Sequence, residues 1–281
     1  MQDKIIIKAP AKINLFLRIY GQKENGYHMI RTGVTFVNLY DEIKIKLNDK
    51  NDLSYSGPFK PSDQIYKDDI IRKILLKKNL IKKNIKLKIN IKKNIPYGAG
   101  LGSASTDAAS FIKYLQNFKL INNFGKKYLS SIGADVPVCY YGKNCLANGI
   151  GDNIFKNIEF QKYYFVLVYP HIKLSTTKMY NKIKKYIKFN YEKNIYNLKT
   201  IHEKDFGNDF EKIVENEHEE VANLLNYLSN LKYCIFARMS GSGSCCYVVF
   251  NKKDLAKKAY QIISKKFKNY WVFLAENNNN L

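Results

Sequence analysis

The sequence predicts an α+β fold with two domains, and three observations support this. Segments with the two-residue apolar period of strands are mixed with segments of helical period, without the regular alternation of a βαβ array. The clearest strand covers residues 85–92, where every second residue is apolar. The chain has 281 residues, 46% of them apolar, which suffices for one large core or two modest ones. A glycine turn at 149–151 places the domains at residues 1–156 and 157–281.

The first half is predicted to begin with strands and to continue through a glycine-rich loop into a helix. Apolar alternation runs from residue 4 to about residue 47, and a polar turn at 21–27 interrupts it. Four further elements are expected besides the strand at 85–92: a helix at 63–78, a glycine-rich loop at 97–107, a helix at 108–118 and a strand-like run at 138–141. Ser62 or Asp63 can cap the helix at 63–78.

The second half is predicted to contain strands and helices around a second, shorter glycine turn. The expected elements are a strand at 163–169, helices at 177–187 and 209–231, strands at 233–239 and 245–250 flanking the turn 240–244, a helix at 254–267 and a strand at 270–274. The asparagine-rich tail at 277–280 is expected to be disordered.

Composition indicates a cytoplasmic protein that does not enter the membrane. No run of about 18 apolar residues occurs, and the first residues lack the apolar segment of a signal peptide. The five cysteines form an odd number without metal-ligand spacing, so we expect buried, reduced thiols rather than a zinc site.

The net charge of +23 is the main argument for a nucleic-acid partner. The basic residues are 43 lysines and only four arginines, however, and the chain is also rich in Asn and Ile. Nucleic-acid surfaces favour Arg for bidentate contacts, whereas Lys, Asn and Ile are what A/T-rich codons supply. We therefore expect no specific nucleic-acid partner, and RNA binding stays open as an alternative function.

The glycine-rich loop lies between a predicted strand and a predicted helix, a setting in which backbone N–H groups and the helix dipole can hold phosphate oxygens. It lacks the Gly-Lys-Ser/Thr of a Walker A loop, and it is a poor dinucleotide fingerprint because Ser103 replaces the third glycine. The hydroxyls of Ser103, Ser105 and Thr106 favour phosphate binding. Alternatively, the loop is a structural turn and Ser105 or Thr106 only caps the helix.

Two charged residues in apolar settings are candidate catalytic groups. Asp135 lies in Gly-Ala-Asp-Val-Pro and can be a general base or a turn residue that bonds its own backbone. Lys12 lies between small and apolar residues of the first strand, where a lysine is costly unless it is paired. Pairing the two would solve the desolvation problem of both and would keep the carboxylate ionised.

Two further turns are candidates for ligand contacts. Tyr27 and His28 follow a polar turn and join an aromatic ring to an imidazole that can bond a base edge, although taken in isolation the pair is better explained as a surface turn with one anchoring ring. The turn 240–244 is either a tight hairpin or a backbone that approaches a ligand.

These segments, in this order, resemble the GHMP kinase superfamily, and within it the branch whose acceptor is a cytidyl-diphospho sugar alcohol. The first strand with Lys12 and Asn14, the glycine-rich loop, the Asp135 segment and the turn 240–244 correspond to family motifs. Tyr27 and His28 together with the Asp135 segment distinguish this branch from the homoserine, mevalonate and galactose branches. The resemblance spans nearly the whole chain.

The resemblance implies an N-terminal ribosomal-protein-S5-like domain, a C-terminal ferredoxin-like domain and the transfer of phosphate from ATP, with Mg²⁺, to the C2 hydroxyl of 4-diphosphocytidyl-2-C-methyl-D-erythritol, an isoprenoid precursor of the non-mevalonate pathway. Asp135 and Lys12 would be catalytic, and the hydroxyl of Ser105 would lie near the metal. ATP phosphates would bind Pro96, Tyr97, Gly98, Ala99, Gly100, Leu101, Gly102, Ser103, Ala104, Ser105 and Thr106. The acceptor would contact Asn14, Tyr27, His28, Tyr180, Gly241 and Gly243. The protein would be a monomer or a homodimer.

The sequence departs from the family at the phosphate loop. Ala99, Ser103 and Ala104 stand where glycine is common, and Thr106 replaces a usual serine. The altered loop leaves open a scaffold that has lost catalysis. A GHMP kinase that acts on another alcohol is a further alternative, besides RNA binding.

Overall fold

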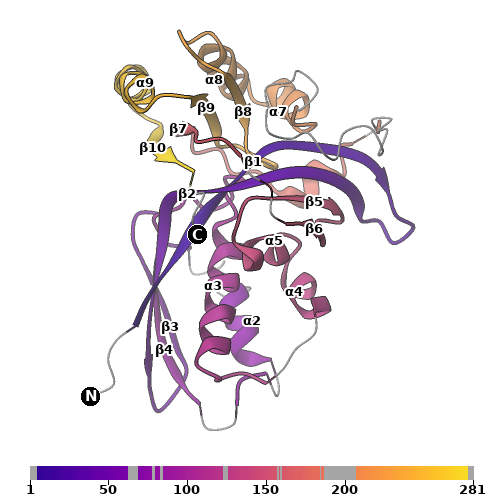
Figure 1. Cartoon of the computed structure of the whole chain (residues 1–281), viewed down its shortest axis with the longest axis vertical. Helices are drawn as coiled ribbons and strands as arrows, with labels where there is room; N and C mark the ends of the chain where they lie inside the picture. The colour runs from indigo at the N-terminus through magenta and orange to yellow at the C-terminus, as the bar shows by residue number, and fades with distance from the viewer. Residues whose placement is uncertain are drawn as a thin grey trace. The chain divides into compact units, whose positions relative to one another are not determined.

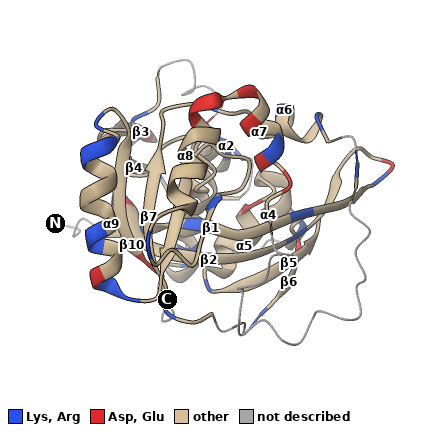
Figure 2. Cartoon of the chain, turned by 90° about the horizontal axis from the view of Figure 1, so that it is seen from above, with Lys and Arg blue, Asp and Glu red and all other residues tan. Residues whose placement is uncertain are grey.

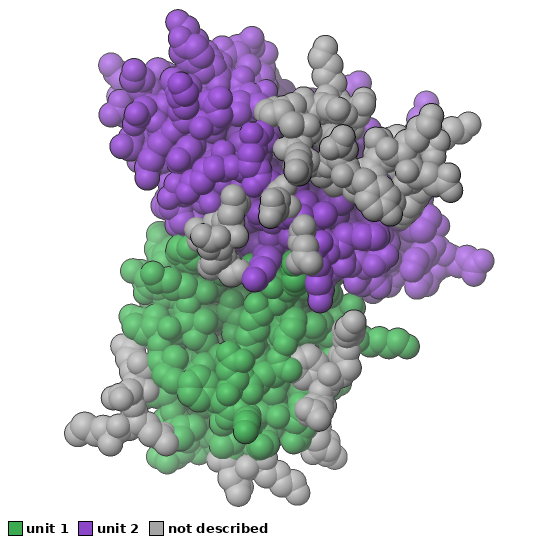
Figure 3. All heavy atoms as spheres, in the orientation of Figure 1, with its two compact units in different colours: residues 1–11, 39–97, 102–142 green, residues 12–38, 98–101, 143–281 purple. Residues whose placement is uncertain are grey.

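The computed structural model describes residues 5–62, 69–77, 80–82, 85–122, 126–156, 158, 160–183, 185–186 and 207–277. The chain forms two compact units, shown in different colours in Figure 3. The first unit consists of Met1–Ala11, Leu39–Tyr97 and Gly102–Gly142. The second consists of Lys12–Asn38, Gly98–Leu101 and Lys143–Leu281. Both units contain strands and helices, which confirms the predicted α+β class.

Two long strands contribute to both units. Strand β1 (Ile5–Gln22) and strand β2 (His28–Leu47) follow the predicted apolar alternation, and a turn separates them where the polar segment predicted one. Gly26 in that turn has φ +83°, a value that favours glycine.

The sheet of the first unit is formed around the C-terminal part of β2. This part pairs antiparallel with β4 (Leu87–Lys92), and β4 pairs parallel with the short strand β3 (Asp52–Ser56). The helices of this unit are α2 (Ile70–Leu76), α3 (Ser103–Asn117), α4 (Lys126–Ile132) and α5 (Val136–Tyr141). Figure 1 shows α2 and α3 beside β3 and β4, where Ile43, Ile89 and Phe111 are part of one buried core.

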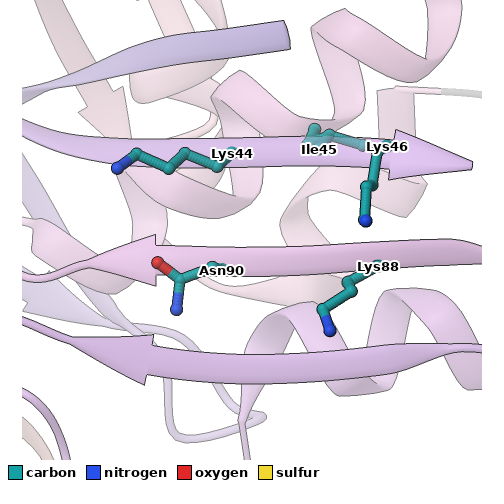
Figure 4. Close-up of a pocket in the computed structure, with 5 residues that line it drawn as sticks. All are labelled: Lys44, Ile45, Lys46, Lys88 and Asn90. Atoms are coloured by element: carbon teal, nitrogen blue, oxygen red, sulfur yellow. The ribbon is translucent and has the colours of Figure 1, made fainter. Parts of the chain in front are cut away.

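The other face of this sheet is polar, because side chains alternate between the two faces of a strand. Lys44 and Lys46 of β2 and Lys88 and Asn90 of β4 line a shallow hollow of about 330 Å³ (Figure 4). Lys88 forms an ion pair with Asp52, with 3.4 Å between nitrogen and oxygen.

Two predictions for the first unit were inaccurate. The run at 138–141 was predicted as a strand but belongs to α5, whose first turn contains Pro137. A short apolar run fits a strand or a buried helix equally, and Pro137 favours the start of a helix. The helix predicted at 63–78 is α2, which is capped by Asp69 instead of Ser62 or Asp63; residues 63–68 and 78 lie outside the described residues.

The second unit contains the N-terminal part of β2 and a separate four-stranded sheet. The part of β2 pairs with β5 (Cys145–Gly149), which pairs with β6 (Asn153–Phe155). The four-stranded sheet has the order β10-β7-β9-β8 and is antiparallel throughout. Its strands are β7 (Tyr164–Tyr169), β8 (Phe236–Met239), β9 (Cys246–Phe250) and β10 (Trp271–Glu276).

Two helices pack on this sheet through apolar faces, α8 (Glu219–Ser229) and α9 (Lys253–Lys266). In chain order the strands and these helices give β-α-β-β-α-β, the arrangement of ferredoxin-like domains, as expected.

Three predictions for the second unit need correction. The helix expected at 209–231 is divided into α7 (Glu211–Glu217) and α8, because His218 has an extended backbone. The helix expected at 177–187 is α6 (Thr176–Tyr180); residues 184 and 187 lie outside the described residues. Asn277, expected in a disordered tail, is buried and bonds Tyr163, and the rest of the tail lies outside the described residues.

The cysteines are free thiols, and all except the half-buried Cys234 are buried. Burial raises the pKa of Cys145 to about 12 and that of Cys234 to about 11. Within the described part of the chain, no helix is long and apolar enough to cross a membrane.

Candidate active site

Lys12 lies in the middle of β1 and is only 4% exposed. A buried ammonium group needs partners, and its Nζ donates to Oδ1 of Asn14 at 2.6 Å. The two residues are two positions apart in the strand, so they project from the same face. The second unit therefore brings together the predicted catalytic lysine and the predicted acceptor-binding asparagine.

Neighbouring hydrogen bonds fix the side chain of Asn14. Its Nδ2 donates to the hydroxyl of Thr32 at 2.8 Å, and that hydroxyl donates to the backbone oxygen of Phe16 at 2.6 Å. Because the amide nitrogen faces Thr32, the amide oxygen faces Lys12. These hydrogen bonds therefore orient the polar chain of Lys12, Asn14 and Thr32.

The turn 240–244 packs against the glycine-rich loop in the same unit. The hydroxyl of Ser240 donates to the backbone oxygen of Gly100 at 2.9 Å, and the backbone N–H of Cys245 donates to the oxygen of Ala99 at 3.1 Å. The approach is so close that a Cβ on Gly100 would lie 1.9 Å from the backbone oxygen of Ser240. Glycine at position 100 is therefore required by space as well as by its φ of +78°.

Both glycines of the turn lie near predicted site residues. A Cβ on Gly241 would lie 3.0 Å from Oδ1 of Asn14 and 3.6 Å from Nζ of Lys12. A Cβ on Gly243 would meet Met239 and Leu174. Gly241 thus borders Lys12 directly, while Gly243 contacts the apolar side of the turn.

In the first unit, the start of α3 leaves backbone donors for a ligand. The N-cap residue is Gly102, with φ +70° and no side-chain cap, so the alternative in which Ser105 or Thr106 caps the helix is wrong. The hydroxyl of Thr106 instead donates to the oxygen of Ser103 at 3.0 Å, and the hydroxyl of Ser103 donates to Asp41 at 2.9 Å. Without a side-chain cap, the first N–H groups of α3 are suited to bind an anion.

Asp135 is the N-cap residue of α5, but its carboxylate does not cap the helix. Gly133, two residues earlier, lies beside α3: a Cβ there would be 4.0 Å from the hydroxyl of Ser105. The first unit therefore places the predicted base segment next to the start of α3. Lys12 belongs to the second unit, and its pairing with Asp135 stays a prediction.

A buried charge cluster that the sequence analysis did not single out lies behind the start of α3. Lys93, only 3% exposed, donates to Asp41 and to Asp107. Asp41 also accepts from the backbone N–H groups of Asn94 and Ile95, at 2.6 and 2.9 Å. Burial favours the neutral form of Lys93, but the charges of Asp107 and Asp41 and their hydrogen bonds hold the pKa of Lys93 above its ordinary value.

The spacing of the strands carried a signal for this cluster. Lys93 continues the series 85, 87, 89 and 91, whose side chains face the core. Asp41 likewise belongs to the series 41, 43 and 45, in which Ile43 and Ile45 are buried. Charged residues at such positions are costly unless they meet. A search for opposite charges at inward-facing positions would have found them.

A cavity of about 460 Å³ lies between this cluster and the first part of α3. Its apolar wall is formed by side chains from β3, α2, α4 and the loops, namely Tyr55, Pro61, Ile70, Tyr97 and Ile132. Its polar wall is formed by four charged residues, namely Asp69, Lys73, Lys93 and Asp107. A cavity of this size, mostly apolar with a few polar groups, is typical of small-molecule sites.

A group of aromatic rings forms in the second unit around His28. The ring of His28 stacks on that of Tyr180, with 4.9 Å between centroids, and the ring of Tyr186 lies 6.1 Å from it. Burial lowers the pKa of His28, which favours the neutral form of the imidazole. Tyr27 is 57% exposed. The structure therefore brings His28 and Tyr180 together, and it leaves Tyr27 open to a ligand.

Comparison with known proteins gives the family. The model of the GHMP kinases N terminal domain matches residues 68–155, and that of the GHMP kinases C terminal region matches residues 192–269. A 4-diphosphocytidyl-2-C-methyl-D-erythritol kinase of Buchnera aphidicola is 34% identical over 93% of this chain and 92% of its own length. The chain belongs to this GHMP kinase family.

Further relatives agree with this assignment. The 4-diphosphocytidyl-2-C-methyl-D-erythritol kinase of Pelagibacter ubique is 33% identical over 94% of this GHMP kinase and 96% of its own length. A crystal structure of 4-(cytidine 5'-diphospho)-2C-methyl-D-erythritol kinase has the same fold, with a TM-score of 0.78 at 23% identity over 98% of this chain and 100% of that one. The domain boundary at residue 156 stays a prediction. The two compact units are interleaved along the chain and do not correspond to residues 1–156 and 157–281.

Proposed function

We propose that this GHMP kinase transfers the terminal phosphoryl group of ATP to the C2 hydroxyl of 4-diphosphocytidyl-2-C-methyl-D-erythritol. The observation that carries the proposal is the 34% identity, over nearly the whole chain, to a kinase named for this acceptor. The geometry supports it, because Lys12 is buried and oriented beside Asn14 and Gly241, and because α3 begins with uncapped backbone donors.

The proposed reaction needs one base and positive charge at the acceptor oxygen. Asp135 accepts the proton of the C2 hydroxyl, and the oxygen forms a bond to the γ-phosphorus while the bond to the bridging oxygen of ADP breaks. Lys12 stabilises the negative charge that develops on the attacking oxygen, and Asn14 holds the ammonium group of Lys12 in place. Most of the catalysis is then positioning and electrostatic stabilisation.

ATP is proposed to bind along the loop and the start of α3. The phosphates lie on the backbone from Pro96 to Thr106, where Gly98, Gly100 and Gly102 all have positive φ. A Cβ on Gly98 would meet no atom within 4 Å, so this position leaves room for close approach. The nucleoside enters the 460 Å³ cavity, whose wall includes Tyr97 and Ala104 of the same loop.

Mg²⁺ fits this site as a companion of the nucleotide. No group of three or more His, Cys, Asp or Glu side chains suited to a metal ion occurs among the described residues, so these residues alone do not form a metal cage. Mg²⁺ usually keeps several waters and binds substrate phosphates with one or two protein oxygens. The half-exposed hydroxyl of Ser105 is the proposed protein contact, and the ion would neutralise phosphate charge.

The cytosine of the acceptor is proposed to bind at the aromatic group of the second unit. Tyr27 and Tyr180 supply ring faces, and the neutral imidazole of His28 supplies one donor and one acceptor to the base edge. Since His28 stacks on Tyr180 in the structure, the base either displaces His28 or packs against its free side.

The test is release of ADP in a coupled assay, with the proposed acceptor, with homoserine and without acceptor. We expect ADP only with the proposed acceptor. Asp135→Asn should lower turnover by about three orders of magnitude or more while ATP affinity changes little, because it removes the base and leaves the phosphate loop intact. Asp52→Asn on β3 is the matched control, since it makes the same change in a surface ion pair and should leave turnover unchanged.

Turnover with homoserine and not with the cytidyl compound would overturn the acceptor and leave a GHMP kinase of another alcohol. Near-normal turnover of Asp135→Asn would remove this residue from the mechanism. ATP binding without turnover on either acceptor would favour a scaffold that has lost catalysis.

A further inference from the structure

One buried oxygen atom at the cavity lacks a hydrogen-bond partner among the described residues. Asp107 is 3% exposed, and its Oδ2 accepts from Lys93, whereas its Oδ1 has no partner within the described part of the chain. Buried polar atoms are nearly always paired, and a carboxylate oxygen without a donor is especially costly. The same residue lines the 460 Å³ cavity, where a ligand can supply the missing donor.

The other carboxylate of the cluster shows what is unusual about Asp107. Asp41 receives four donors, from Lys93, Ser103 and the backbone of Asn94 and Ile95, so both of its oxygens are satisfied. Asp107 receives one. Asp41 therefore serves as the main counter-ion of Lys93. Oδ1 of Asp107 is not needed for this purpose and can accept a hydrogen bond from a ligand in the cavity.

The walls of the cavity favour a planar base over a sugar as the source of that donor. Tyr55, Ile70, Tyr97 and Ile132 offer ring faces and aliphatic carbons, against which a flat purine can pack. A ribose carries its 2'- and 3'-hydroxyls together on one face, and burying them against these apolar side chains would cost their hydrogen bonds to water. Adenine carries an exocyclic amine that donates, whereas hypoxanthine and guanine carry an accepting oxygen at the same position.

We propose that Oδ1 of Asp107 accepts a hydrogen bond from the exocyclic amine of adenine, which makes Asp107 a specificity-determining residue for ATP. This inference rests on the proposed function, since it concerns the nucleotide of the same site. Lys93 holds the carboxyl group in place through Oδ2 and so leaves Oδ1 directed to the base. A nucleotide with oxygen in place of the amine would set two acceptors against each other and would leave Oδ1 unpaired.

The experiment compares the binding of ATP, inosine triphosphate and 2'-deoxy-ATP by calorimetry, in the presence of Mg²⁺ and without the acceptor. Measurements are made at pH 9, because burial raises the pKa of Asp107 to about 8 and the carboxyl group must be ionised. We expect the wild-type protein to bind ATP at least about tenfold more tightly than inosine triphosphate, as one discriminating hydrogen bond allows.

Asp107→Asn should place a hydrogen-bond donor, instead of an acceptor, opposite the base. Lys93 donates to the position of Oδ2, so the amide turns its oxygen toward Lys93 and presents its NH₂ group to the cavity. The ratio of ATP to inosine triphosphate affinity should then fall at least about tenfold, because a donor now faces the position. Asp107→Ala removes the acceptor without adding a donor and should bring the ratio close to one. Asp52→Asn is the charge control, and circular dichroism checks the folding of each variant.

Each outcome decides the question. Equal ratios in the wild type and in both Asp107 variants, with ATP still bound, would overturn the inference and leave the proposed function standing. The Asp107 variants could instead lose discrimination against 2'-deoxy-ATP while their ratio of ATP to inosine triphosphate affinity stays that of the wild type. The donor would then be the 2'-hydroxyl of the sugar, and this result would also overturn the inference. Binding of none of the nucleotides by the wild type would overturn the proposed function and this inference with it.

Discussion

Gly98 and Gly100 have similar backbone conformations and very different surroundings, so they separate two roles of glycine in the phosphate loop. Their φ angles are +66° and +78°. A Cβ on Gly98 would meet no atom within 4 Å, whereas a Cβ on Gly100 would collide with the backbone of Ser240. Gly98→Ala should cost only the strain of a positive φ, about 1 kcal/mol of unfolding free energy. Gly100→Ala should cost clearly more and should also weaken nucleotide binding.

Urea unfolding and ATP calorimetry on the two variants test this difference. The shared φ makes Gly98→Ala the matched control for strain. If both variants lost the same stability and kept the same ATP affinity, the contact between Gly100 and Ser240 would not hold the loop in solution.

Substitutions in the cluster of Lys93, Asp41 and Asp107 should lower the free energy of unfolding more than substitutions on the surface of the first unit. Lys93→Met leaves two buried carboxylates close to each other without their cation, and breaking a buried pair in this way costs about 3 to 5 kcal/mol. Lys46→Met, on the outer face of the same sheet, should change the free energy of unfolding by less than about 0.5 kcal/mol.

Chemical denaturation of both variants measures the difference. A cost below about 1 kcal/mol for Lys93→Met would show that the carboxylates become protonated or reach water without the lysine.

At the level of single residues, the sequence was informative where a charge stood in an apolar setting. Lys12 was singled out for this reason, and it is buried beside Asn14. Lys93 also stands in an apolar setting, but it follows Lys92 directly and lies just beyond the predicted strand at 85–92, so it was not singled out. Asn14 was expected to orient the acceptor, and in the structure it also binds Lys12. This bond depends on contacts of Asn14 with Thr32 and Ser240, which are distant in the sequence and leave no local pattern.

Among the elements, α7 carries a carboxyl group whose ionisation should affect stability. Glu211, at the first turn of α7, accepts from the backbone N–H of Met239 at 2.8 Å. Burial raises the pKa of Glu211 to about 7, against the opposing effects of this hydrogen bond and of Arg238. The native state therefore binds a proton that the unfolded state releases above pH 4.5 or so.

The sign of the effect follows from proton linkage. Because the native state binds more protons between about pH 4.5 and pH 7, the contribution of Glu211 to stability falls as the pH rises through this window. Glu211→Gln keeps an acceptor for Met239 and removes the titration. Its unfolding free energy, relative to the wild type, should rise on the order of 2 kcal/mol from pH 4.5 to pH 8.

Urea unfolding at several pH values measures this difference, with the exposed Asp254→Asn on α9 as the control for removal of a surface charge. A constant difference between Glu211→Gln and the wild type from pH 4.5 to pH 8 would contradict the raised pKa of Glu211.

Elements with a strong period were predicted well, and short ones were not. Strand β4 and helix α9 each lie within one or two residues of their predicted limits, because their apolar residues repeat clearly over the whole element. Strand β3, strand β6 and helix α4 were missed, since segments of three to seven residues hold too few repeats to define a period. The break at His218 depends on a single backbone conformation that leaves no mark in the apolar pattern of 209–231.

For the whole molecule, the excess of lysine should give only weak binding to nucleic acid. Figure 2 shows Lys and Arg residues spread over several helices, strands and loops, and α9 contains several of them. The hollow with Lys44, Lys46 and Lys88 has no aromatic side chain among its lining residues on which a base could stack. We expect gel-shift binding to generic RNA at low salt that is lost at physiological salt, with a dissociation constant no tighter than about 10⁻⁵ M.

Tight RNA binding that persists at physiological salt would support the alternative function suggested by the net charge. Substituting Lys44, Lys46 and Lys88 by Gln together would then show whether the hollow is responsible. In the expected case these substitutions leave turnover unchanged.

The path of the chain through the two units determines how the protein can be divided. It passes from one unit to the other after Ala11, Asn38, Tyr97, Leu101 and Gly142, and β1 and β2 each contribute to both. A fragment ending at residue 156 would carry Leu17, Ile19 and Ile30 without the core that buries them, which includes Val166, Leu224 and Val248. Expressed alone, such a half should aggregate, and the two halves should regain solubility only when produced together. Exchange of whole halves between related genes would meet the same obstacle, because each half would lose part of the core that buries its strands.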